Sequence, residues 1–167
     1  ERPALCAGGD GCVYVAANTR NSAWVAVARY SANLTNPTPV IARLDSSSNR
    51  RAWNPSVAAD RNTPESLQTA VAMYSHKDTA GKITPHFGWT RTAGRAWSSA
   101  VWPATNQVRT TWDARFPSVR QSYDDNLIRG IVTMHEPTAS WDTLVYAFTR
   151  PSMPSVWEDR ARRNEYR

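Results

Sequence analysis

Short apolar runs alternate with polar clusters along the whole chain. The runs are rich in Val, Tyr, Trp and Thr, and clusters of Asn, Ser, Pro, Gly and Asp separate them. Because helical periodicity is nearly absent, this pattern predicts an all-β protein. The strands are expected at residues 12–17, 23–30, 40–44, 56–59, 68–74, 83–90, 118–121, 128–134 and 143–149. Residues 155–164 fit either a last strand or a short terminal helix, for which Ser155 is an acceptable N-cap.

Several of these runs repeat in the same order. Three similar segments are each followed by a polar loop, a second apolar run and a Trp. The three segments are 24–31, 69–75 and 130–135, the second runs are 40–44, 83–90 and 144–149, and the Trp residues are Trp53, Trp97 and Trp157. A second landmark, Pro-Ser-Val, lies at nearly the same distance before Met73 and before Met134. Since the spacing between these landmarks is nearly the same in both copies, we predict a repeated structural unit.

The repeated unit is expected to be a four-stranded antiparallel meander. Twisted sheets of this kind form the blades of a β-propeller when they repeat radially. We predict one domain over residues 1–167, with three units at about 11–53, 54–102 and 116–161, an N-terminal Cys loop at 1–10 and a basic tail at 162–167. Three blades do not close a ring, because the smallest propellers have four. Another copy, giving six blades, or missing blades would complete the ring; a β-sandwich is the alternative fold.

A tight turn is predicted between the run at 83–90 and Trp97. Thr90, Gly94 and Trp97 match three fixed positions of the pattern Ser/Thr-x-Asp-x-Gly-x-x-Trp, and Thr92 stands where Asp is expected. With this pattern, the repeated region resembles the sialidase-type, or Asp-box (BNR-repeat), β-propellers. The resemblance implies that the three matching residues form a structural turn on the face opposite the active site. Gly94 is expected to adopt a positive φ.

Composition and charge narrow the classes of partner. The eight Trp residues suit either packing between sheets or stacking on sugars. The net charge is +6 and the pI is about 9.8, but the basic residues are scattered among 14 acidic ones, and only 160–167 form a basic run. A nucleic-acid partner is therefore not expected, whereas an anionic glycan remains compatible. No apolar run approaches the ~20 residues that span a bilayer, and the start of the chain shows no signal-peptide pattern, as in a mature or excised form.

The two cysteines, Cys6 and Cys12, flank a Gly-rich loop. Glycines let such a short loop close, so a disulfide between the two is predicted. A close pair with no thiol left over favours an oxidising compartment, which makes the protein secreted, extracellular or periplasmic. The rival interpretation is a two-ligand metal site, although no His or third Cys lies nearby.

The resemblance places function at the end of the blades opposite the tight turn. That end should carry loops 31–38, 75–82 and 135–142 and the connections near Asn54 and at 103–115. Trp stacks on sugar rings, while Arg and Asp bind hydroxyls or carboxylates. The candidate ligand-binding residues are His76, Lys77, Asp78, Arg109, Trp112, Asp113, Arg115, His135, Glu136, Trp141 and Asp142. The alternative is that the two Trp side chains cover strand edges and that the charges are solvated.

Catalytic residues are not assigned. Glycoside hydrolysis needs two carboxylates, or a Tyr–Glu pair with an acid, in one pocket. No spacing singles out a pair among Tyr30, Tyr74, Tyr123, Asp113, Glu136 and Asp142. The resemblance to sialidases further implies three arginines and an Arg-Ile-Pro motif, and the chain has no Arg-Ile-Pro. No Gly-x-Ser-x-Gly supports a serine triad with any of the three His residues.

His76 and His135 are predicted to occupy equivalent repeat positions and to face one rim. A metal site there would need a third ligand, Asp78 or Glu136. We expect no metal and no cofactor. The favoured function is a secreted, lectin-like carbohydrate-binding module. The alternatives are a fragment or subunit of a sialidase-like glycoside hydrolase, and a structural or assembly protein whose sheet edges contact other subunits.

Overall fold

Three four-stranded antiparallel sheets make up the protein. The computed structural model describes residues 3–9, 11–18, 24–32, 39–44, 51–62, 67–102, 113–122, 124–135 and 141–166, without the side chains of 114, 141 and 159–166. The first sheet has the order β1 (Ala4–Ala7), β2 (Val13–Asn18), β3 (Val25–Tyr30) and β4 (Val40–Arg43). The second has β5 (Arg51–Ala59), β6 (Ala70–Lys77), β7 (Ile83–Thr90) and β8 (Ser98–Val101). The third has β9 (Asp113–Gln121), β10 (Ile128–His135), β11 (Trp141–Thr149) and β12 (Glu158–Tyr166).

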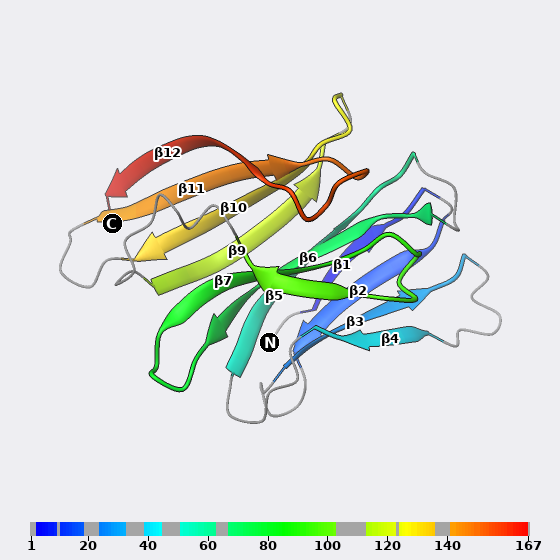
Figure 1. Ribbon diagram of the computed structural model, residues 1–167, viewed down its shortest axis with the longest axis horizontal. Helices are drawn as coiled ribbons and strands as arrows, with labels where there is room; N and C mark the ends of the chain where they lie inside the picture. The colour runs from blue at the N-terminus through cyan, green and yellow to red at the C-terminus, as the bar shows by residue number, and fades with distance from the viewer. Residues whose placement is uncertain are drawn as a thin grey trace.

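Each sheet is a meander of consecutive strands, as Figure 1 shows. The predicted fold class, with three four-stranded antiparallel sheets of the kind that form propeller blades, is confirmed. Within the described ranges every regular element is a strand, and none is a helix that could span a membrane. Residues 158–166 form a strand rather than the terminal helix left open by the sequence.

The predicted first unit, 11–53, is wrong by one strand. Trp53 lies in β5 of the second sheet, where it pairs with Ser75 of β6. The first sheet instead begins at Ala4, inside the predicted Cys loop, and ends at Arg43. β1 has only four residues, too few to show an alternating pattern in the sequence. Because the prediction missed β1, it took β2 as the first strand and ended the first unit one strand too late. The predicted basic tail likewise belongs to β12 as far as Tyr166.

The Pro-Ser-Val landmark marks the same backbone feature in the second and third sheets. Asn54 in β5 has φ 51° and Phe116 in β9 has φ 49°, and each stands directly before the Pro. The pairing with the neighbouring strand shifts at both places. Such shifts are β-bulges, which bend a strand and redirect its side chains. The innermost strands of the two sheets therefore carry equivalent bulges.

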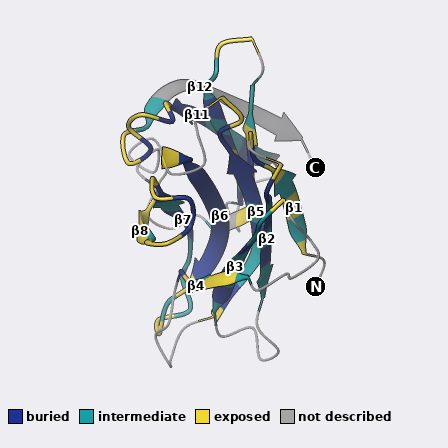
Figure 2. Cartoon of the chain, turned by 90° about the vertical axis from the view of Figure 1, so that its right-hand side faces the viewer, coloured by how far each residue is buried: buried dark blue, intermediate teal, exposed yellow. Residues whose placement is uncertain are grey.

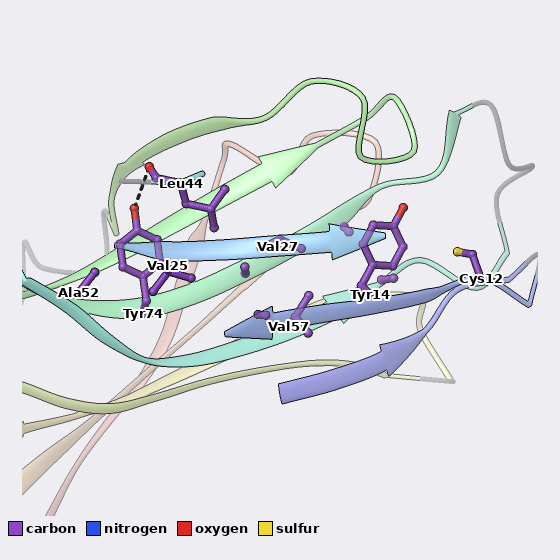
Figure 3. Close-up of a cluster of buried hydrophobic side chains, with 12 residues drawn as sticks. Cys12, Tyr14, Val25, Val27, Leu44, Ala52, Val57 and Tyr74 are labelled. Carbon is purple, nitrogen blue, oxygen red and sulfur yellow. Dashed lines mark hydrogen bonds between the residues drawn. The ribbon is translucent and has the colours of Figure 1, made fainter. Parts of the chain in front are cut away.

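The second sheet lies between the other two and packs against both (Figure 1). One buried cluster joins the first and second sheets, and Figure 3 shows Tyr14, Val25 and Val27 in it together with Val57 and Tyr74. The Tyr74 hydroxyl donates a hydrogen bond to the Leu44 carbonyl across this interface, at 3.3 Å. Because both of its faces are covered, the second sheet has no free face in the described structure.

The other buried cluster joins the second and third sheets. It includes Met73 and Phe87 from the second sheet and Val132 and Val145 from the third. Trp157 packs edge-on against Phe87, with the ring centroids 5.5 Å apart. Figure 2 shows β6 buried over most of its length, whereas β8 is exposed at the edge of its sheet.

The predicted disulfide is absent, because neither Cys6 nor Cys12 takes part in a disulfide. The Cys12 thiol donates a hydrogen bond to Gln68 Oε1 at 2.9 Å, and the Gly8 N–H donates to the Cys12 carbonyl at 2.9 Å. A Cβ on Gly9 would lie 1.9 Å from the Arg61 carbonyl oxygen. The glycines thus allow close packing of two turns, and the loop needs no covalent closure.

Candidate functional site

The turns and loops gather at two ends of the sheets. Consecutive strands alternate in direction, so the β1–β2, β3–β4, β5–β6, β7–β8, β9–β10 and β11–β12 connections lie at one end, here called the turn end. Hydrogen bonds from Gly9 N–H to the Asp60 carbonyl, and from Arg61 N–H to Gln121 Oε1, join the turn ends of all three sheets. The other end, here called the loop end, holds the β2–β3, β6–β7 and β10–β11 connections.

The predicted tight turn lies at the turn end and is tied by side-chain hydrogen bonds. Thr90 Oγ1 accepts from the backbone N–H groups of Thr92 and Gly94, each at 3.2 Å. Thr92 Oγ1 accepts from the Ala96 N–H at 3.0 Å, so this hydroxyl supplies the acceptor at the position where Asp was expected. Gly94 has φ 79°, and the Trp97 ring packs edge-on against Tyr14 with centroids 6.5 Å apart. These residues hold the second sheet against the first.

The loop at 31–38 does not belong to the predicted functional end. It joins β3 to β4 and therefore lies at the turn end, with 33–38 outside the described residues. The error follows from the missed strand β1, which reverses the assignment of every connection in the first sheet. The loop-end connection of that sheet is the one between β2 and β3.

The described candidate residues all lie at the loop end. Arg109, Trp112 and Glu136 lie outside the described residues, and Trp141 is described only as the first backbone position of β11. The others are His76, Lys77, Asp78, Asp113, Arg115, His135 and Asp142.

A row of four candidates crosses from the second sheet to the third. Lys77 pairs with Ile83, whose N–H donates a hydrogen bond to Asp113 Oδ1 at 3.3 Å. Asp113 pairs with His135 in the neighbouring strand, and His135 Nδ1 lies 2.9 Å from Asp142 Oδ1. The structure therefore brings together Lys77, Asp113, His135 and Asp142, which come from three separate segments of the chain.

His76 does not belong to this row. It is 2 % exposed, and its ring lies 4.4 Å from that of His86, centroid to centroid. Val57 pairs with Ala72 and Val119 pairs with Gly130, so His76 is equivalent to Met134 and not to His135. The predicted equivalence of the two histidines is therefore wrong by one residue. Among the described residues, no three His, Cys, Asp or Glu side chains are grouped as metal ligands.

Asp78 has a local structural role. Its Oδ1 accepts a hydrogen bond from the Lys82 N–H at 2.9 Å, and its own N–H donates to the Lys82 carbonyl at 2.9 Å. The Gly81 N–H also donates to the Asp78 carbonyl, at 3.1 Å. This carboxylate closes the β6–β7 loop, as Asp side chains do in turns.

Phe116 is a surface residue that the sequence did not single out. Its side chain is 69 % exposed although it is large and apolar, and it follows exposed Arg115 in β9. A positive φ is unusual for a bulky residue, and strained positions of this kind cluster at functional sites. The only signal in the sequence was an aromatic residue directly before Pro-Ser-Val.

Arg115, His135 and Asp142 lie on one face of the third sheet. Arg115 pairs with Thr133, two residues before His135, and residues two apart on a strand point to the same side. Asp142 pairs directly with His135. A cation, an imidazole and a carboxylate thus share one face, and the exposed Phe116 follows Arg115 in the chain; such groups are able to bind a polar, partly apolar ligand.

A second aromatic–cation pair lies at the loop end of the first sheet. The guanidinium carbon of Arg43 lies 3.4 Å from the centroid of the Trp24 ring, and Arg43 is exposed. This pair was not predicted, because the two residues are 19 positions apart and meet only through the β3–β4 pairing.

The fold is sialidase-like. The structure is similar to that of the Hadza microbial sialidase Hz136, with a TM-score of 0.69 and 11 % sequence identity over 97 % of this chain. The chain spans 37 % of the length of that sialidase. No family model and no curated protein matches the sequence. At this identity the likeness concerns the arrangement of strands.

Proposed function

We propose that this chain is a lectin-like, carbohydrate-binding module that binds an anionic glycan at the loop end of its third sheet. The observation that carries the proposal is the likeness to a sialidase across 97 % of the chain. Enzymes of that name act on sialic acids, which are sugars bearing a carboxylate. A secreted, extracellular or periplasmic location is proposed on the ligand class alone, since no disulfide joins Cys6 and Cys12 to indicate an oxidising compartment.

Arg115 and Phe116 offer the two kinds of contact that such a ligand needs. A guanidinium can bind a carboxylate through two parallel hydrogen bonds. An aromatic face covers the apolar side of a sugar ring. Asp142, whose side chain is 25 % exposed beside His135, is placed to accept hydrogen bonds from hydroxyls. The Lys77 side chain is exposed at the other end of the same row and adds positive charge.

The structural roles of residues at the turn end support placing the ligand site at the loop end. Packing between the sheets involves Gly94 and Trp97 of this turn. The hydrogen bond from the Gly94 N–H to Thr90 Oγ1 supports assigning the turn to a degenerate Asp box. In that family the box lies opposite the ligand site. We therefore assign ligand binding to the loop end.

We predict that Arg115→Ala weakens binding of 3′-sialyllactose at least tenfold. The loss of a charge-assisted bidentate contact accounts for an effect of about 1.5–3 kcal/mol. Isothermal titration calorimetry of the purified chain measures the affinity, and circular dichroism checks that each variant is folded. Arg95→Ala is the matched control, because Arg95 is equally an exposed arginine but lies in the turn at the opposite end.

The Arg95 variant should bind within twofold of the unsubstituted chain. Equal losses in the two variants would point to non-specific attraction between a basic protein and an anion. Binding of neutral lactose as tightly as sialyllactose would contradict the role given to the carboxylate.

The row Asp113–His135–Asp142 favours one second candidate, a contribution to glycoside hydrolysis. His135 Nδ1 lies 2.9 Å from Asp142 Oδ1, and Asp113 is the residue of β9 that pairs with His135; acid–base catalysis uses such groups. A fluorogenic sialoside distinguishes the two functions. Turnover that Asp142→Asn abolishes while binding persists would identify an enzyme, whereas binding without turnover fits a lectin.

A further inference from the structure

A groove runs along the inner edges of the three sheets, near their turn end. β1, β5 and β9 are edge strands of their sheets, and together they line a space of about 520 Å³. Its lining includes the last residue of each of these strands, which are Ala7, Ala59 and Gln121. Small-molecule sites in proteins occupy roughly 300–1,000 Å³, so the groove has room for a compact ligand. It is separate from the candidate glycan site, which lies at the loop end.

Backbone N–H groups of β1 and β5 point into this groove. In an antiparallel pair, the N–H and C=O groups of successive residues alternate between facing the partner strand and facing away from it. The Gly8 N–H donates to the Cys12 carbonyl within the first sheet, at 2.9 Å. The Asp60 N–H donates to the Thr69 carbonyl within the second sheet, at 2.8 Å. The alternate residues of the two strands therefore face the groove, and they are Leu5, Ala7, Val57 and Ala59.

β9 is joined to β5 by the Ser56 hydroxyl and contributes a further N–H group. Ser56 Oγ accepts a hydrogen bond from the Val119 N–H at 3.0 Å and donates one to the Val119 carbonyl at 3.4 Å. The Val119 N–H thus points away from β10, and so does the N–H of Gln121, two residues further along the strand. The bridge through Ser56 holds β5 and β9 side by side as two walls of the groove.

The charged side chains that line the groove in the described structure are two arginines. Arg61 follows β5 and Arg120 lies in β9, and both are exposed. Burial raises the pKa of the Cys6 thiol, and the positive charge of Arg61 partly opposes that rise, so Arg61 acts on the wall that β1 forms. The buried Asp60 carboxylate accepts a hydrogen bond from Gln121 Nε2 at 3.2 Å and is not part of the lining. The described lining is therefore positively charged.

We propose that this groove is a second binding site, for a small hydroxylated anion that bears carboxylate or phosphate groups. Guanidinium groups and backbone N–H groups are the donors with which proteins bind such oxyanions. The C=O groups that face the groove from the same strands accept hydrogen bonds from the hydroxyls of the ligand. Since both charged side chains of the described lining are cationic, the groove favours a ligand with more than one negative charge over a neutral sugar. This site does not depend on the proposed glycan site.

Titration of the isotope-labelled chain with citrate, followed by amide NMR, tests the proposal. Citrate carries carboxylates and a hydroxyl, which are the groups that the groove is expected to bind. The amide signals of the groove should shift together and saturate at millimolar citrate. The largest shifts are expected at Leu5, Ala7, Val57, Ala59 and Gln121. A parallel titration with inorganic phosphate separates the two kinds of anion, because tighter binding of phosphate assigns a phosphate-bearing ligand and tighter binding of citrate assigns a carboxylate.

Variants of the lining show whether the groove itself binds the anion. Arg61→Ala and Arg120→Ala should each weaken binding of the tighter anion about tenfold, through the loss of charge-assisted hydrogen bonds. Arg95→Ala is the matched control and should bind within twofold, because Arg95 is an exposed arginine at the turn end that does not line the groove. Ser118→Trp keeps both arginines but fills space in the groove, and should also weaken binding.

Three results would overturn the proposal. The first is that neither citrate nor phosphate gives saturable shifts. The second is that the shifts spread over basic surfaces outside the groove. The third is that Arg95→Ala loses as much affinity as Arg120→Ala, which would indicate non-specific attraction to a basic protein. The amide spectrum of each variant also shows whether it is folded, so a loss of binding is not confused with misfolding.

Discussion

The thiol of Cys6 is held in its neutral form by its surroundings. Burial, and to a smaller extent the nearby Cys12 thiol, raise its pKa from 9.0 to about 12, while Arg61 partly opposes both. A raised pKa means that the folded state keeps a proton that the unfolded chain releases. The contribution of this thiol to stability is therefore complete below pH 9 and declines between pH 9 and pH 12.

We predict that Cys6→Ala removes this loss of stability at alkaline pH. The stability difference between the unsubstituted chain and the variant should be constant below pH 9. Above it, the unsubstituted chain should lose up to about 1.4 kcal/mol per pH unit relative to the variant. Urea denaturation at pH 7, 9, 10 and 11 measures the free energy of unfolding of both proteins. Parallel curves for both proteins over the whole range would show that Cys6 does not titrate differently in the two states.

What the sequence could not predict at the site is mainly the direction in which single side chains point. His76 and Lys77 are neighbours, yet the first is buried against His86 and the second is exposed. Which face each takes depends on strand register, and a one-residue shift exchanges the two faces. The loop end was predictable from repeat order for the second and third sheets. The outward turn of Phe116 depends on a bulge, which leaves no alternating pattern to read.

At the scale of elements, we derive a prediction from the conformation of the β7–β8 turn. Gly94 has φ 79°, a conformation that β-branched residues rarely adopt. Gly94→Val should therefore destabilise the fold by about 1–3 kcal/mol. Gly94→Asn is the control, since Asn tolerates this region better and should cost less. Chemical denaturation measures both, and equal stability of the Val variant and the unsubstituted chain would contradict the strain.

Strand length decides which elements the sequence reveals. β6 and β7 have eight residues each, and their apolar runs are evident. β1 and β8 have four residues each, β8 is wholly exposed, and neither has alternating apolar and polar residues in its sequence. The missing β1 is what displaced the predicted first unit. The turn at Thr90 was readable because its hydrogen bonds depend on local spacing, whereas sheet membership depends on pairing between distant residues.

At the scale of the whole molecule, Gln68 links the first two sheets. It is fully buried in the β5–β6 connection, and its Oε1 accepts hydrogen bonds from the Cys12 thiol at 2.9 Å and from the Tyr14 hydroxyl at 3.0 Å. Its backbone carbonyl accepts a third from the Ala93 N–H at 3.1 Å. One residue therefore joins β2, the Cys loop and the β7–β8 turn.

A double-mutant cycle tests this link. Gln68→Met removes the side-chain acceptor while keeping most of the volume, and should cost about 1–3 kcal/mol because the buried Tyr14 hydroxyl loses its partner in the second sheet. Tyr14→Phe alone should cost about 1 kcal/mol. In the Gln68→Met background the same change should cost less, since the hydrogen bond between these two side chains is already lost. Additive losses by urea denaturation would mean that the Gln68 and Tyr14 side chains are not coupled, and a single unfolding transition in all four proteins would show that the first two sheets unfold together.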